Sequence, residues 1–444
     1  MKDMTTGNPV KLVLGFAVPM LIGNVFQQFY NVVDTVVVGK YLGETQLAGV
    51  GSTGTLTGFL FALVYGMSNG SGIIVAQCYG SKKTGQLKKT VVSLIWVSAI
   101  MAVLLSVIGL IFSETFLRLL SVPDNVIGYS VTYLKIIYGF VYFSVICNGA
   151  GAILRAVGDS KAPLYALIVS SFVNVGLDLL FVIVFDMGVK GVAWATIIAQ
   201  FVSAVITLYF LIRKRKEIGL TKLNLRPDLQ NIHVLVKTGF PAAFQSCMIS
   251  LGGMSVQRLI NSFGSTVMAA YVAANRIDSV AIQVIVSIGS ALSVFTGQNI
   301  GSGNYKRIRE GLYKTMCIMV GASFLIAVLV LTFRYPLLRL FLDSSSSAEA
   351  IEYGAVYLTI IGIAYVIAGV MNSYLNVIRG AGDVNTCMIA GLTELSGRIV
   401  FAYILAPILG PTGIWIATPI SWGCGCIVPV VRYYSGKWKL KKLV

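Results

Sequence analysis

The sequence contains few charged side chains and a single histidine. Only 11% of its 444 residues are charged, 56% are hydrophobic, and the mean hydropathy is +0.83. Because a soluble domain has roughly 25% charged residues, this chain carries more apolar surface than a soluble fold can bury. With His233 as the only imidazole, a histidine-based catalytic triad or zinc site is excluded. The chain also lacks a GxxxxGK[ST] phosphate loop, which argues against ATP as an energy source.

Cysteines are few as well. The seven cysteines stand singly in apolar segments, apart from Cys424 and Cys426, and their spacing matches neither a disulfide framework nor a zinc site. We assign them to packing. These absences leave a chain with no sign of an enzyme, a cofactor or a structural metal.

What the sequence has in abundance is long apolar runs. Twelve runs of roughly 20 residues, the length that crosses a ~30 Å hydrocarbon core as a helix, are separated by short polar segments. The sequence therefore predicts twelve transmembrane helices in two sets of six. They are expected at 12–38, 48–77, 91–112, 130–152, 163–185, 191–212, 236–262, 270–298, 315–333, 353–377, 385–408 and 412–433.

Positive charge is distributed unevenly between the loops. Of the 34 Lys and Arg residues, 25 lie in one alternating set of loops and 5 in the other. Basic loops stay in the cytoplasm, so we expect a multi-pass protein of the plasma (inner) membrane with both termini cytoplasmic. The net charge of +17 then reflects loops that face anionic lipid, and nucleic acid is not expected as a partner.

The two sets of helices repeat in sequence. The segment ILRAVGDSKAP (153–163) matches VIRGAGDVNTC (377–387), and AQCYGSKKTGQLKKT (76–90) matches GQNIGSGNYKRIREG (297–311). The offset stays near 221–224, so both halves face the same way in the membrane. We expect an all-α polytopic membrane protein of two pseudo-symmetric six-helix bundles around a central cleft. The predicted parts are an N-terminal lobe (1–212), a basic cytoplasmic linker (213–235) and a C-terminal lobe (236–444).

These motifs resemble the multidrug and toxic compound extrusion (MATE) family over nearly the whole chain. The resemblance includes PMLIGNVFQQFYNVVDTVVVGKYLGETQLAGV (19–50), the paired LRAVGD and IRGAGD loops, and TGFPAAFQ at the start of the second half. It implies antiport of cationic or amphiphilic small compounds against Na⁺ or H⁺ by rocking of two lobes. It also implies that the first helix bends at Pro19 when a cation binds.

Ionisable residues at membrane depth are costly, so they are candidates for function. Four polar residues are predicted to lie roughly 6–20 Å below the outer surface at 1.5 Å per residue: Asp34, Asn174, Asp178 and Thr196. Two carboxylates in a low-dielectric pocket repel each other, which favours binding of a proton or a metal cation, and amide and hydroxyl oxygens suit Na⁺. The same positions match those where MATE proteins bind the coupling ion.

The repeat provides an internal control for this site. The positions aligned with Asp34 and Asp178 are Ser255 and Ala402, so the second half folds without these carboxylates. This comparison favours an ion-binding role over a purely structural one, in which the polar residues would only fix two helices together.

The second half has polar residues of its own. Glu394 and Arg398, spaced i,i+4, form either a structural salt bridge or a second coupling or substrate site. Asp278 and Arg276 are expected at the membrane interface, and Asp159 and Asp383 as turn and capping residues. Polar residues that line the predicted substrate cleft, or instead join helices, are Gln27, Tyr30, Asn31, Gln200, Gln257, Asn372 and Asn376.

Other readings remain. A lipid-linked oligosaccharide flippase of the same superfamily usually has additional helices and a cationic cavity. A membrane-embedded enzyme is a further alternative, but the sequence has no HExxH motif to support it. A channel is also possible in principle, but acidic residues confined to one lobe suit occlusion and release better than a continuous pore. We therefore expect a monomeric exporter whose partners are a small-molecule substrate and the lipid bilayer, with no cofactor and no metal besides Na⁺ at the cation site.

Overall fold

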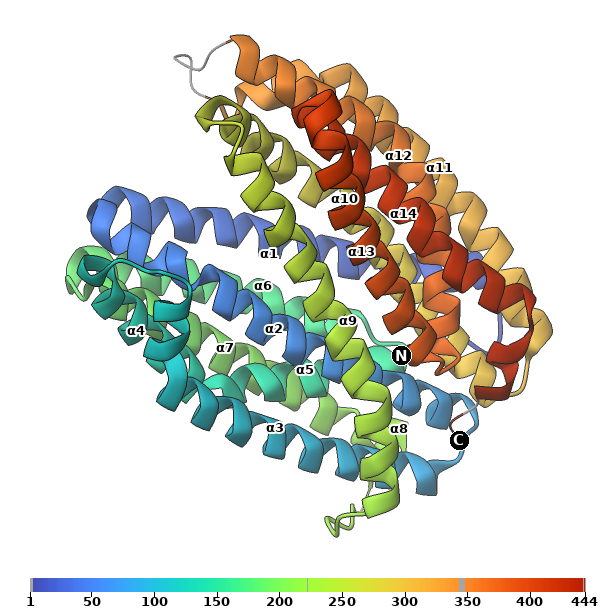
Figure 1. The fold of residues 1–444 in the computed structure, drawn as a ribbon. Coiled ribbons are helices and arrows are strands. Elements are labelled where there is room, and N and C mark those ends of the chain that lie inside the picture. Colours follow the sequence, from blue (N-terminus) through green and yellow to red (C-terminus); the bar gives the residue numbers. More distant parts are fainter. Residues whose placement is uncertain (1–2, 222, 343–347, 442, 444) are drawn as a thin grey trace. The chain divides into compact units, whose positions relative to one another are not determined.

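The structure is a computed structural model that describes residues 3–221, 223–342, 348–441 and 443, without the side chains of residues 31, 32, 34–36, 38, 44, 250 and 254. Every regular element in these residues is helical (Figure 1). Eleven helices are long and apolar enough to cross a membrane, and the pair α4 and α5, bent by 46°, completes twelve spans. The prediction of an all-α membrane protein with twelve spans is confirmed.

The chain divides into two compact units. The first contains Ile22–Ala243, and the second contains Met4–Leu21 and Phe244–Leu443. Two helices, α1 (Pro9–Tyr41) and α9 (Leu229–Asn261), therefore belong partly to each unit. The units and the sequence repeats consequently differ in the first part of each repeat.

Both shared helices contain a proline close to the boundary between the units. Helix α1 passes into the first unit after Leu21, two residues beyond Pro19, and α9 passes into the second unit after Ala243, two residues beyond Pro241. Within the first unit, the start of α9 packs tightly on α2, because a Cβ on Gly66 would lie 2.4 Å from the Ala243 Cα. Proline removes one helical hydrogen bond, so both positions are places where these helices can bend.

The first unit is built from long helices whose polar backbone groups are satisfied internally, as a bilayer requires. Its core contains Leu60, Val64, Leu134, Ile137 and Val192, whereas α3 exposes apolar residues such as Val103 and Ile111 along its length. Its elements are α2 (Gly43–Gly80), α3 (Thr84–Leu119), α4 (Asp124–Gly139), α5 (Val141–Ala156), α6 (Lys161–Leu179), the π-helical segment η1 (Leu180–Val184), α7 (Gly188–Arg213) and α8 (Arg215–Ile218).

The second unit has a larger aromatic core. Trp415 is 1% exposed, stacks on Tyr271 at 5.6 Å between ring centroids, and meets Tyr357 edge-on at 5.2 Å. Its elements are α10 (Ser265–Gly301), α11 (Tyr305–Arg339), α12 (Ala348–Gly380), α13 (Val384–Leu409), α14 (Pro411–Tyr434) and the short helix η2 (Lys437–Lys441). From Met4 onward the N-terminal segment belongs to this unit, where the Met4 N–H donates to Gln298 Oε1 at 2.8 Å.

The two GD loops have matching structures. Gly158 and Gly382 adopt φ values of +85° and +94°, which favour glycine. Asp159 Oδ1 accepts the backbone N–H groups of Lys161 and Ala162, each at 3.2 Å. This carboxylate also pairs with Lys214, and Asp383 pairs with Arg432 at 2.6 Å. The predicted capping role is thus present at Asp159, and both aspartates tie their loop to the last long helix of their repeat.

Candidate functional site

The polar residues that the sequence singles out in α6 lie in the interior of the first unit. Asn174 and Asp178 are spaced i,i+4, so they share one face of the helix, and they are only 2% and 0% exposed. Asn174 Oδ1 has no hydrogen-bond partner among the residues that the structure describes. Because buried polar oxygens are nearly always satisfied, this acceptor is suited to a donor or cation from outside the protein.

The α-helical hydrogen bonds change directly after Asp178. Residues 180–184 form the π-helical segment η1, in which the Phe185 N–H donates to the Leu180 carbonyl oxygen at 3.1 Å. Asp178 lies six residues before the end of this combined span, or about 9 Å along the helix axis. Short π-helical segments occur frequently at functional sites. Sequence periodicity gave no signal for this one.

The other two residues of the predicted cation site are less closely defined. Thr196 lies on α7, which packs against α6, and its hydroxyl donates to the Val192 carbonyl oxygen at 3.0 Å. The hydroxyl oxygen keeps its capacity to accept or to bind a cation. The Asp34 side chain lies outside the described residues, so the structure brings together Asn174 and Asp178 and leaves the full group of four as a prediction.

In the second unit, Glu394 and Arg398 form the ion pair that their spacing allows. Arg398 Nη2 donates to Glu394 Oε1 at 3.0 Å, and the two side chains are 17–19% exposed. A Cβ on Gly425 would lie 3.3 Å from the Glu394 Cβ, so α13 and α14 approach closely here. The pair therefore sits at a helix contact, whereas a functional role for it stays a prediction.

Asp278, which we expect at the membrane interface, has a defined environment in the second unit. Its carboxylate accepts the hydroxyl of Tyr365 at 2.8 Å and that of Tyr357 at 3.3 Å, both from α12. Asp278 lies 13 residues inside a 37-residue helix, about 20 Å from its start. Arg276, two residues earlier, is exposed. The expected position at the interface stays a prediction.

The residues predicted to line a cleft have several different environments. Gln27 is exposed, while Tyr30 and Gln200 are half-buried; the side chain of Asn31 lies outside the described residues. Gln257 donates to Asn261 Oδ1 at 2.8 Å. Asn372 donates to the Ala368 carbonyl oxygen at 3.0 Å, and Asn376 accepts from Arg379 Nη1 at 3.1 Å. Most of these contacts within the second unit are local to one helix, so they leave the cleft role as a prediction.

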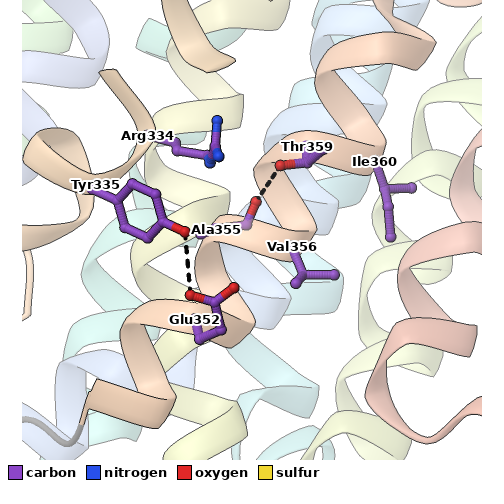
Figure 2. Close-up of a pocket in the computed structure, with 7 residues that line it drawn as sticks. All are labelled: Arg334, Tyr335, Glu352, Ala355, Val356, Thr359 and Ile360. Carbon is purple, nitrogen blue, oxygen red and sulfur yellow. Dashed lines mark hydrogen bonds between the residues drawn. The ribbon is translucent and has the colours of Figure 1, made fainter. Parts of the chain in front are cut away.

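Figure 2 shows a small pocket between α11 and α12 in the second unit. Tyr335 donates to Glu352 Oε2 at 3.2 Å, and Thr359 donates to the Ala355 carbonyl oxygen at 2.7 Å. Its volume is about 140 Å³, below the roughly 300–1,000 Å³ of drug-sized ligand sites. None of the residues predicted as site residues lines it, and it is smaller than a site for a drug-sized ligand.

Repeated six-helix halves of apolar, membrane-length helices, with the buried carboxylate of Asp178 inside one candidate span, are typical of a polytopic membrane transporter. The MatE family model matches residues 19–180 and 241–404, which cover both repeats. The chain belongs to the MATE family, whose members are membrane transporters coupled to ion gradients and not enzymes.

Two bacterial relatives with similar sequences are named as probable multidrug resistance proteins. The chain is 29% identical to the probable multidrug resistance protein YpnP of Bacillus subtilis, with 99% of this chain and 98% of the relative covered. It is 28% identical to the probable multidrug resistance protein YoeA of the same organism, over 96% and 94% of the two chains. Among solved structures, an outward-facing multidrug resistance MATE transporter matches with a TM-score of 0.92 at 23% identity, over 99% of each chain, and supports the fold.

Proposed function

We propose that this protein exports cationic or amphiphilic small organic compounds in exchange for Na⁺ or H⁺, and that the coupling ion binds in the first repeat at Asp34, Asn174, Asp178 and Thr196. The observation that carries the proposal is the buried Asn174 Oδ1, which has no partner in the described residues and lies one turn from Asp178. A carboxylate, an amide oxygen and a hydroxyl are the hard oxygen ligands that Na⁺ prefers, and the carboxylate alone serves a proton.

The substrate class rests on the relatives. YpnP and YoeA are named as probable multidrug resistance proteins, and they align with almost the whole of this chain. Polyspecific recognition uses adaptable apolar surface, and the half-buried polar side chains of α1 and α7 supply a few hydrogen bonds beside it. We place the transport path between an N-terminal lobe (1–212) and a C-terminal lobe (236–444) that are joined by the linker 213–235.

The loop charges support the orientation of the chain that this proposal uses. We propose that both termini lie in the cytoplasm and that the chain spans the plasma (inner) membrane. In this orientation Asp34 and Asp178 lie in the outer half of the membrane, where external cations reach them. If cation and substrate favour different conformations, each weakens binding of the other by the same factor. Bending of α1 at Pro19 would couple the ion site to the rest of a monomeric, rocking transporter.

The test is export from proteoliposomes with Na⁺ and pH gradients imposed separately. Wild type is expected to transport a fluorescent organic cation when one of the two gradients is imposed. This transport is expected to fall about 100-fold in Asp178→Asn. The matched control is Asp278→Asn in the second unit, where the Asp278 carboxylate accepts the hydroxyls of Tyr357 and Tyr365, and this variant is expected to retain gradient dependence. Equal loss in both variants, or transport by wild type with neither gradient, would refute coupling at the first repeat.

A further inference from the structure

Three tyrosine hydroxyls from three different helices meet at one end of the second unit. Tyr434, the last residue of α14, lies with its Oη 3.2 Å from that of Tyr374 on α12 and 3.5 Å from that of Tyr313 on α11. Arg309 adds a guanidinium group 5.9 Å from the centre of the Tyr313 ring. A hydroxyl cluster beside an arginine offers several donors to one phosphate group.

The cations at this end of the unit are not all neutralised by carboxylates. Glu310 is paired with Lys314 at 2.6 Å, and Asp383 is paired with Arg432. In the residues that the structure describes, Arg309, Lys437 and Lys439 have no such ion pair, and all three are exposed. Arg309 leaves a positive charge beside the ring of Tyr313, and Lys437 and Lys439 follow Tyr434 by three and five residues.

The helix lengths place this cluster at the edge of the hydrocarbon core. Helix α11 has 35 residues and is about 52 Å long, so it extends about 11 Å beyond each side of a ~30 Å core when centred. Tyr313 lies eight residues from its start, or about 12 Å along the axis, and Arg309 about 6 Å. The tyrosine ring is therefore at the boundary and the guanidinium group is in the headgroup layer, as in other interfacial aromatic belts.

An apolar stripe leads from the same cluster into the membrane. Ile427, Val431 and Tyr434 are spaced i,i+4,i+7 on α14 and are 61%, 61% and 63% exposed. The apolar side chains of this stripe suit an acyl chain. The tyrosine hydroxyls and Arg309, at the end of the stripe nearer the membrane surface, suit a headgroup. The neighbouring helix η2 is fixed by Trp438, which is 2% exposed and stacks on Tyr433 at 5.5 Å, so Lys437 and Lys439 are held near this edge.

We propose that Tyr313, Tyr374, Tyr434 and Arg309 form a binding site for one anionic phospholipid, with its phosphodiester at the hydroxyls and its acyl chain on the stripe of α14. The charge, the depth and the apolar stripe together select a lipid over a free anion. The site lies within one unit, so it is independent of the ion site and of the proposed function.

Native mass spectrometry of the detergent-purified chain, titrated with phosphatidylglycerol or phosphatidylcholine, tests this site. Wild type is expected to bind phosphatidylglycerol more tightly. Arg309→Gln is expected to weaken that binding about fivefold, the factor that corresponds to about 1 kcal/mol for one basic residue at an anionic surface. Tyr434→Phe, which keeps the ring, is expected to weaken it about threefold. Arg309→Gln should leave phosphatidylcholine binding unchanged, whereas Tyr434→Phe should weaken it as well, because both lipids carry the phosphodiester that the hydroxyls bind.

Two control variants separate the site from general surface charge and aromatic content. Arg339→Gln removes an exposed arginine at the opposite end of α11, and Tyr403→Phe changes an exposed tyrosine on α13; both are expected to bind like wild type. Equal weakening in the controls, absence of any lipid preference in wild type, or thermal stabilisation by inorganic phosphate as large as that by phosphatidylglycerol would each overturn the proposal.

Discussion

In the first unit, Asn174 and Asp178 are buried on one face of α6, and Asn174 Oδ1 has no hydrogen-bond partner among the described residues. In the second unit, the Asp278 carboxylate accepts two tyrosine hydroxyls from α12. A carboxylate that already holds donors on both oxygens is stabilised without an ion, whereas an unsatisfied acceptor favours one. Two repeats with the same helices thus have different polar interiors, and the difference favours the first repeat for the coupling ion.

The two units have a matching ion pair at the GD loops, where the two sequence repeats match closely. Asp159 and Asp383, in the two GD loops, are 5% and 3% exposed and each pairs with a basic residue at the end of the last long helix of its repeat. Because the pairs recur in both halves, they belong to the scaffold. The carboxylates Asp34 and Asp178, which align with Ser255 and Ala402 and so do not recur, are the better candidates for function.

The largest effect on stability is expected from breaking the ion pair of either GD loop. Asp159→Asn and Asp383→Asn each leave a partly buried cation without its carboxylate, and each should lower the free energy of unfolding by about 2 kcal/mol, less than for a fully buried pair because Lys214 and Arg432 are about a quarter exposed. Chemical unfolding of the detergent-purified protein measures this loss of unfolding free energy.

The control for that prediction is an ion pair on the surface. Glu310→Gln breaks an exposed i,i+4 pair with Lys314 and should leave the unfolding free energy close to that of wild type, because solvent screens exposed ion pairs. A loss at Glu310 as large as those at the GD loops would mean that burial is not what makes the loop pairs important, and the two units would then share less than their geometry indicates.

A second prediction separates the two polar interiors. Asn174→Leu keeps the approximate volume of the side chain and removes the buried amide oxygen. It should therefore weaken binding of the coupling cation about tenfold, or about 1.4 kcal/mol, with little change in the stability of the fold. The concentration of Na⁺ or H⁺ that gives half-maximal export in proteoliposomes measures the change.

Tyr365→Phe is the counterpart in the second unit. It removes the 2.8 Å hydrogen bond to Asp278 and should cost about 1.5 kcal/mol of stability while the cation dependence of export stays unchanged. If the two variants exchanged these outcomes, the second unit would hold the coupling ion, and the comparison drawn above would have to be reversed.

Much of this architecture follows from local sequence. Run length and the repeat offset predict the twelve spans, and the i,i+4 spacing predicts that Asn174 and Asp178 share a face, as it predicts the pair Glu394 and Arg398. The rule behind these successes is that residues within two turns of a helix have fixed relative positions. Nothing beyond the sequence was needed to find them.

What the sequence misses depends on distant residues. Asp278 meets Tyr357 and Tyr365, which lie 79 and 87 positions away, so helix packing and not spacing decides its environment. The π-helical segment after Asp178 and the 46° bend between α4 and α5 likewise leave the periodicity of apolar residues unchanged. Likewise, no local pattern indicates that α1 begins in one compact unit and ends in the other.

The smallest expected effect compares two helix caps, one charged and one neutral. In the first unit, Asp228 Oδ1 accepts the Asn231 N–H at 3.1 Å at the start of α9, and Lys89 lies 3.4 Å from the other carboxylate oxygen. In the second unit, Asn304 Oδ1 accepts the Arg307 N–H at 3.2 Å at the start of α11. Asp228→Ala and Asn304→Ala should each cost about 1 kcal/mol at pH 7, a shift of about 1 °C in the unfolding midpoint for a chain of this size.

Only the charged cap should depend on pH. The pKa of Asp228 lies below the ordinary aspartate value, chiefly because its carboxylate accepts the backbone N–H of Asn231. A carboxyl whose pKa is lowered by folding stabilises the protein above its unfolded pKa of roughly 3.9, and this contribution disappears as the pH falls through the lower folded pKa. The difference between wild type and Asp228→Ala should therefore shrink between pH 7 and pH 3, whereas Asn304→Ala keeps its cost. Asp228→Asn, which keeps a cap but no charge, should behave like the neutral cap, and a pH-independent Asp228→Ala would show that the charge contributes nothing to α9.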